Sequence, residues 1–137
     1  MEVARPRCAF LGLGDADEHA HLGDYRSYLA ALRAFDAFVG ELTATLARQG
    51  EHGASTTVIV TTDHGRADSV TGHGAKHPES GRVWLFAAGG AVPARGKVAL
   101  AQPAKLADVA PTARTLLGLP EAPFDERSGR VLAELTR

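Results

Sequence analysis

The chain has 137 residues, which is enough for a single domain with its own hydrophobic core. Its 15 basic and 16 acidic side chains give a net charge of −1, so no nucleic-acid or membrane-surface partner is expected. A hydrophobic content of 45% argues against disorder, and no apolar run approaches the roughly 20 residues of a membrane span. The charged, proline-containing start does not resemble a signal peptide, which favours a cytoplasmic location.

The first predicted element is a buried strand over residues 8–14, an apolar run in which the single cysteine, Cys8, is expected to be a core residue. A polar cluster, residues 15–21, follows at the carboxyl end of this strand. It contains Asp17 and His21, four residues apart. One helical turn or a tight loop would aim both side chains at the same ion.

A helix is predicted from about residue 24 to residue 48, because apolar side chains recur there at steps of three and four. Asp24 is a plausible N-cap and Gly50 a plausible stop. A polar loop over residues 51–55 then leads to the next apolar run. Strand, helix, loop and strand form a βαβ unit, which predicts two parallel strands joined by a right-handed crossover.

The second predicted strand begins at Thr57 and stops abruptly at Asp63 and His64, with Gly65 following. Ligands bind outside the carboxyl ends of the strands in open α/β sheets, which is where this acid and imidazole are expected. On a regular strand the two side chains would point to opposite faces. They can therefore share an ion only where the strand has ended.

A long loop without apolar periodicity, residues 65–81, carries two further histidines, His73 and His77. Such loops at the carboxyl edge of a sheet are usually functional or mobile. The remaining predicted elements are a strand over 82–88, a short strand over 98–100, a helix over 105–118 that ends at Gly118, and a short helix near 131–135. The expected fold is α/β, with a mainly parallel sheet, flanking helices and one domain spanning residues 1–137.

Acid and imidazole side chains thus follow two successive predicted strands, and a histidine cluster lies on the next loop. Taken singly, each of these histidines is better explained as an exposed loop residue, and Asp63 could merely cap a turn. Their coincidence at one edge of a sheet favours a divalent-metal site, because aspartate and imidazole are suitable ligands for zinc or manganese.

Four segments, in order along nearly the whole chain, resemble the C-terminal portion of the alkaline phosphatase superfamily, which includes sulfatases, phosphodiesterases and cofactor-independent phosphoglycerate mutases. Asp63-His64-Gly65 resembles its Asp-His-Gly signature, and residues 17–21 resemble its Asp-x-x-x-His segment. Residues 72–84 resemble the loop that supplies its last histidine. Residues 108–120 resemble its sulfatase-type C-terminal helix.

The resemblance implies two divalent metal ions, usually zinc, with manganese as the other choice. By position, Asp17, His21 and His73 would hold one ion, and Asp63 and His64 would ligate the other. Asp15 is an alternative carboxylate, but only Asp17 has the required spacing to His21. His77 has no counterpart: it is expected either to support a ligand or contact the substrate or, in preference, to be a solvated loop residue. Arg66 is expected either to face an anionic substrate or to form an exposed salt bridge.

The resemblance also implies an upstream aspartate and a nucleophile, which this chain is expected to lack: no serine or threonine precedes Asp17. The first interpretation is the metal-binding half of a hydrolase of small phosphate or sulfate esters, with the N-terminal half missing or supplied by a separate chain. The second is a non-catalytic metal-binding pseudoenzyme. The third is a truncated remnant without activity.

Overall fold

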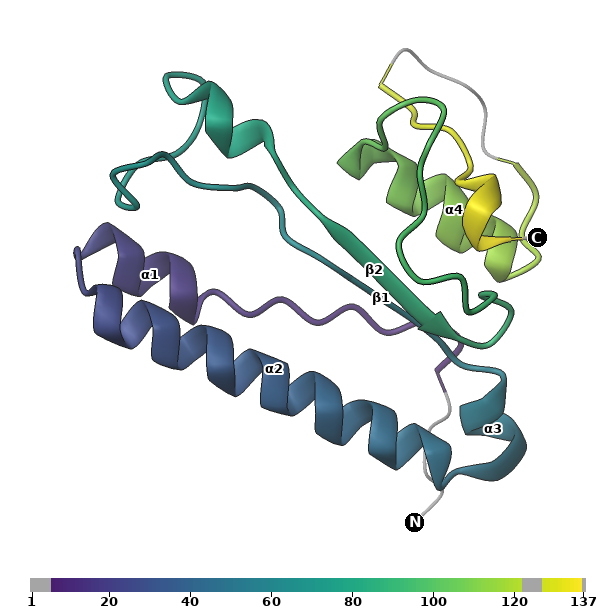
Figure 1. The fold of residues 1–137 in the computed structure, drawn as a ribbon. Coiled ribbons are helices and arrows are strands. Elements are labelled where there is room, and N and C mark those ends of the chain that lie inside the picture. The colour runs from purple at the N-terminus through teal and green to yellow at the C-terminus, as the bar shows by residue number, and fades with distance from the viewer. Residues whose placement is uncertain (1–5, 122–126, 137) are drawn as a thin grey trace.

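The computed structural model describes residues 6–121 and 127–136. Two paired strands cross the molecule, with α1 and α2 on one side and α4 with the C-terminal segment on the other (Figure 1). The helices and strands are α1 (Asp15–His21), α2 (Tyr25–Ala47), α3 (Gly50–Ala54), β1 (Thr57–Thr61), β2 (Leu85–Gly89) and α4 (Val109–Leu116). Short 3₁₀ turns occur at Pro78–Gly81, Leu106–Asp108 and Ala133–Leu135.

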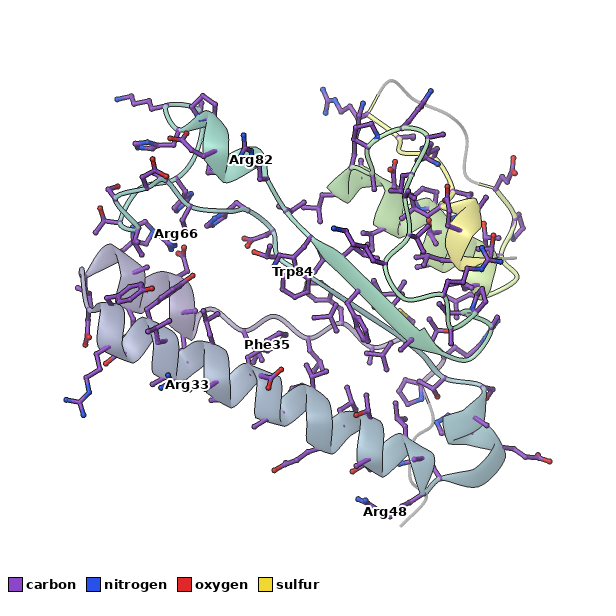
Figure 2. The ribbon with its side chains drawn as sticks, viewed as in Figure 1. Arg33, Phe35, Arg48, Arg66, Arg82 and Trp84 are labelled. Atoms are coloured by element: carbon purple, nitrogen blue, oxygen red, sulfur yellow. The ribbon has the colours of Figure 1, made fainter. Side chains whose placement is uncertain are left out.

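The long helix expected from the apolar periodicity is confirmed as α2. Its N-cap is Asp24, whose carboxylate accepts a hydrogen bond from the Ser27 amide at 3.0 Å. Phe35 lies on the side of α2 that faces the strands (Figure 2). No residue of α2 is fully buried, however, so its apolar face is only partly covered by the described part of the chain.

A sharp corner joins α1 to α2 and places the α1 side chains at one end of the molecule. Gly23 adopts a positive φ of 71°, which glycine tolerates without a steric penalty. The amides of Gly23 and Asp24 donate to the carbonyls of Ala20 and His19, and these bonds close the end of α1. The polar cluster that the sequence left as a helical turn or a loop is therefore a helix.

The mainly parallel sheet expected from the sequence is not confirmed. The sheet in residues 6–121 and 127–136 has two strands, β1 and β2, which pair antiparallel with Thr57 opposite Gly89 and Thr61 opposite Leu85. Parallel pairing needs a crossover that returns the chain to the starting edge. The connection from β1 to β2 has no such crossover helix and reverses the chain direction instead.

The prediction that residues 8–14 form a buried strand of the sheet is wrong. Residues 8–14 are extended and run between α2 and the strands, but they belong to no sheet (Figure 1). Phe10 is 93% exposed, and Cys8 is also exposed rather than a core residue. A strand needs a neighbouring backbone to pair with, and this segment finds none within the described residues.

The later elements follow the sequence with shifted boundaries. β2 starts at Leu85 rather than residue 82, and the short strand expected over 98–100 does not form. The helix expected over 105–118 consists of a 3₁₀ turn followed by α4, with Pro111 in the first turn of α4. A 3₁₀ turn replaces the short helix expected near the C-terminus.

The best-buried contacts connect α4 to the C-terminal segment. Asp108 is 2% exposed, and its carboxylate accepts from the amides of Lys105 and Arg130 at 2.8 and 2.9 Å. The Leu132 amide donates to the Thr112 hydroxyl at 2.9 Å. Among the described residues, the buried apolar side chains are Ala20, Ala67 and Leu132, so the core is small. No helix in that part of the chain is long and apolar enough to span a bilayer.

Candidate metal centre

Helix α1 supplies the first two candidate ligands. Asp17 and His21 are four residues apart, so both side chains project from the same face of the helix. The His21 Nε2 atom lies 3.2 Å from Asp17 Oδ2. The helical turn that the sequence allowed between these residues is therefore present, and it brings the acid and the imidazole together.

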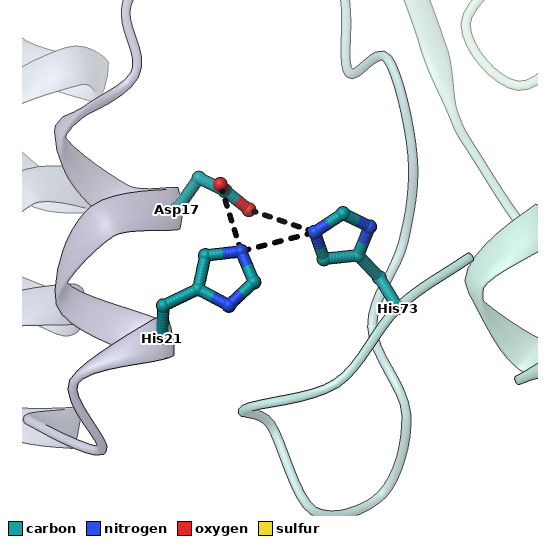
Figure 3. Close-up of side chains that lie close together, drawn as sticks. All are labelled: Asp17, His21 and His73. Carbon is teal, nitrogen blue, oxygen red and sulfur yellow. Dashed lines mark hydrogen bonds and ion pairs between the residues drawn. The ribbon is translucent and has the colours of Figure 1, made fainter.

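The third candidate ligand, His73, comes from the long loop between β1 and β2. Its Nε2 atom lies 3.0 Å from His21 Nε2 and 3.8 Å from Asp17 Oδ1, as Figure 3 shows. One donor atom from each of Asp17, His21 and His73 lies within 4.8 Å of the others. Residues 52 positions apart in the chain thus meet at one point.

The chemistry of these three donors fits a divalent ion. Zinc ligands lie about 2.0–2.1 Å from the metal, which separates neighbouring ligand atoms in a tetrahedral site by roughly 3.3 Å. His21 Nε2 lies 3.0 Å from His73 Nε2 and 3.2 Å from Asp17 Oδ2, both close to that value, while His73 approaches the other carboxylate oxygen, Oδ1, at 3.8 Å. One carboxylate and two imidazoles also form a common donor set for a catalytic zinc site, which keeps a further position open.

The surroundings of His73 favour its neutral form. Burial lowers the pKa of His73, and the nearby His64, His21 and Arg66 lower it further, whereas the Asp17 carboxylate raises it. A neutral imidazole is the form that binds a metal, because a protonated ring has no free lone pair. The lowered pKa is therefore compatible with a ligand role.

The strand-end pair, Asp63 and His64, is arranged differently. The His64 Nδ1 atom lies 2.9 Å from the Gly65 carbonyl oxygen, which only accepts, so Nδ1 carries the proton and Nε2 is free. His64 Nε2 lies 3.5 Å from Asp17 Oδ1 and 3.8 Å from Asp63 Oδ2, and the ring stacks on His73 with centroids 3.8 Å apart. The Asp63 side chain is 84% exposed.

Gly65 allows the loop to approach the chain that returns toward β2. Its amide donates to the Ser80 carbonyl at 2.7 Å, and a side chain at this position would lie 2.5 Å from the Arg82 carbonyl oxygen. The sequence suggested that this glycine lets the chain turn after His64. The structure adds a closer constraint, because only glycine fits the backbone contact.

Arg66 is the residue of the site whose position the sequence did not predict. Its guanidinium pairs with the Asp17 carboxylate, and its side chain is only 12% exposed, so it is neither solvent-facing nor an exposed salt bridge. The two residues are 49 positions apart, and no periodicity or spacing signals such a contact.

Two other residues considered from the sequence lie outside the cluster of Asp17, His21 and His73. Asp15 is exposed in the first turn of α1. His77 is partly buried and packs against Gly72, where an added side chain would lie 2.7 Å from its Nε2 atom. The ring of His77 thus lies beside a glycine and is partly, rather than fully, exposed to solvent.

Comparison with known proteins agrees with a metal-binding fold. Residues 3–121 match the model of the metalloenzyme superfamily. The chain therefore belongs to the metalloenzyme superfamily, whose fold is alkaline phosphatase-like. No solved structure matches it significantly.

The similar curated proteins are bisphosphoglycerate-independent phosphoglycerate mutases. The chain is 30% identical to 2,3-bisphosphoglycerate-independent phosphoglycerate mutase of Synechococcus sp. (strain JA-2-3B'a(2-13)), over 90% of the chain and 23% of that protein. It is 31% identical to the enzyme of the same name from Ectopseudomonas mendocina (strain ymp), over 98% of the chain and 25% of that protein. The chain thus spans about a quarter of the length of the curated relatives it matches.

Proposed function

We propose that the chain is the metal-binding portion of an enzyme that acts on small phosphate esters. Asp17, His21 and His73 hold one divalent ion, and Asp63 with His64 contributes to a second. The convergence of three donor atoms within 4.8 Å, from α1 and a distant loop, is the observation that carries this proposal. Zinc suits the donor set, and manganese is the alternative.

Two features of this portion favour the metal-binding form of its histidines. The Gly65 carbonyl fixes the tautomer of His64, and burial favours the neutral ring of His73. When bound, two such ions polarise the phosphoryl group and stabilise the charge of the attacking and leaving oxygens. The name shared by the relatives supports a phosphate ester, and it favours phosphoryl transfer as much as hydrolysis. A sulfate ester is the second substrate class.

A non-catalytic metal-binding domain is the second candidate function. It is favoured by the exposure of Asp63 and by the small number of ligands at the second position. In either case residues 1–137 act as one domain. Further ligands and an attacking group would come from another part of the protein or from a separate chain. Phe10, Trp84 and Phe86 are exposed apolar side chains that such a part could cover.

The test is metal content by mass spectrometry for the purified chain and its Asp17→Asn, His73→Asn double variant. Turnover of p-nitrophenyl phosphate and p-nitrophenyl sulfate is assayed on the same samples. We expect near-stoichiometric metal that the double variant lacks. Turnover that depends on Asp17 and His73 would favour the enzyme, and bound metal without turnover would favour the non-catalytic domain. Equal metal in both samples, or none in either, would contradict the proposed site.

A further inference from the structure

Arg66 connects the two elements that carry the ligands. One guanidinium nitrogen, Nη2, donates to both the backbone carbonyl and the carboxylate Oδ1 of Asp17, on α1. The other, Nη1, donates to the carbonyls of Val70 at 3.0 Å and Thr71 at 3.4 Å, in the loop that leads to His73. Figure 2 places Arg66 between this loop and α1. A planar guanidinium can make all four contacts at once, whereas an ammonium cannot.

The turn over residues 67–72, which Arg66 contacts, has an unfavourable backbone conformation that other interactions must stabilise. Val70 adopts a φ of 65°, which is sterically unfavourable for a β-branched residue. The turn is closed by the Val70 amide, which donates to the Ala67 carbonyl at 2.8 Å, and by the Ala67 amide, which donates to the Gly72 carbonyl at 3.0 Å. Gly72 directly precedes His73. The conformation of residues 67–72 therefore sets where the His73 ring lies.

We propose that Arg66 is a positioning residue for the metal site: it fastens the 67–72 turn to α1 and so fixes His73 against Asp17 and His21. The assignment rests on the proposed metal site, and it replaces a substrate-facing role for Arg66. The carboxylate keeps Oδ2 toward His21 at 3.2 Å while Oδ1 meets the guanidinium. Arg66 thus orients Asp17 without covering Oδ2, the oxygen that faces His21.

Cobalt binding tests this role. Co²⁺ is titrated into the wild-type chain and into Arg66→Gln, Arg66→Lys and Arg33→Gln, and visible absorption reports both affinity and ligand geometry. We expect Arg66→Gln to weaken binding about 10–100-fold, the usual cost of removing a group that orients a ligand. Arg66→Lys keeps the positive charge but cannot contact α1 and the 67–72 turn at the same time. This variant should therefore bind cobalt more weakly than wild type and give an altered cobalt spectrum. Arg33 is an exposed arginine of α2 and serves as the control for loss of charge.

Amide hydrogen exchange in the metal-free chain tests whether Arg66 fastens the 67–72 turn, independently of metal binding. In Arg66→Gln we expect the Ala67 and Val70 amides to exchange at least about tenfold faster, because the 67–72 turn opens locally. The amide of Leu42, within α2, should exchange at its wild-type rate, which shows that the fold persists. If wild-type chain takes up no cobalt, the proposed metal site fails, and the exchange rates alone then decide whether Arg66 fastens the turn.

Several results would overturn the inference. Wild-type cobalt affinity in Arg66→Gln, or tighter binding because a competing cation has gone, would exclude a positioning role. Wild-type affinity and spectrum in Arg66→Lys would show that charge alone is enough. Unchanged exchange of Ala67 and Val70 would show that the turn does not depend on Arg66.

Discussion

The two groups of candidate ligands differ in how the chain holds them. Asp17, His21 and His73 are joined to one another by contacts of 3.0–3.8 Å, and Arg66 ties the helix and the loop that carry them. Asp63 follows the end of β1 with its carboxylate 84% exposed. The first group can be organised by this chain alone. Among residues 6–121 and 127–136, the second group is not part of a cluster of three or more candidate ligands.

The largest expected effect is on zinc affinity. It is tested by replacing one aspartate of each group with asparagine. Asp17→Asn should lower the affinity for zinc by more than about 100-fold, since removing even an orienting group costs about 10–100-fold. Asp63→Asn should change the affinity of the first site by less than about threefold, because exposed charges interact weakly. Isothermal titration calorimetry measures both. Equal losses would show that the two groups form one site.

Zinc should also stabilise the chain, because an ion that binds only the folded state shifts the unfolding equilibrium. At a free zinc concentration of 100 times Kd, the free energy of unfolding should rise by about 2.7 kcal/mol. Thermal unfolding with zinc or with a chelator measures this shift. Asp17→Asn is the control, and zinc should raise its free energy of unfolding only slightly. Identical midpoints for wild-type chain under both conditions would contradict a folded-state metal site.

His64 lies between the two groups, so its removal sharpens the comparison. His64→Ala deletes the ring that stacks on His73 and approaches Asp17 Oδ1 at 3.5 Å. We expect a loss of about tenfold in zinc affinity at the first site, as for an orienting neighbour. This loss should be smaller than that of His73→Ala and larger than that of Asp63→Asn. A His64→Ala loss as large as that of His73→Ala would make His64 a ligand of the first ion.

The smallest expected effect concerns the corner that leads from α1 into α2. The Ser27 amide, which donates a hydrogen bond to the Asp24 carboxylate, lowers the pKa of Asp24 below the ordinary aspartate value of 3.8. A lowered carboxyl pKa stabilises the fold above pH 3.8, and this contribution is lost as the pH falls through the folded-state pKa. Asp24→Ala should therefore reduce the thermal midpoint at pH 6 and much less near pH 2.

Asp36→Ala, which removes an exposed carboxylate within α2, is the control for that experiment. Alanine favours the interior of a helix, so this control should not lower the midpoint. A loss for Asp24→Ala that persists unchanged at low pH would contradict a charged N-cap.

Local sequence patterns predicted the local structure well. The steps of three and four in residues 25–47 predicted α2, and the β-branched run from Thr57 predicted β1. The spacing of Asp17 and His21 anticipated their contact, since helix geometry alone brings residues four apart together. The meeting of α1 with the loop that carries His73 was suggested by the coincidence of these groups at one sheet edge and by the family resemblance.

Pairing between distant segments was not predictable in the same way. Residues 8–14 have the composition of a buried strand, yet whether such a segment enters a sheet depends on a neighbour that its own sequence does not encode. The Arg66–Asp17 contact is similar, because it joins residues 49 positions apart in the chain. Composition shows that an arginine is present, but not which carboxylate it meets.

The buried junction at Asp108 has a consequence for how the chain opens. Asp108 and Thr112 hold the C-terminal segment through bonds with almost no exposure to solvent, whereas α2 has no buried residue along its 23 residues. Local opening is cheapest where few buried contacts must be broken. The longest helix should therefore fray before the short C-terminal junction, which would form the most persistent cooperative unit of the chain.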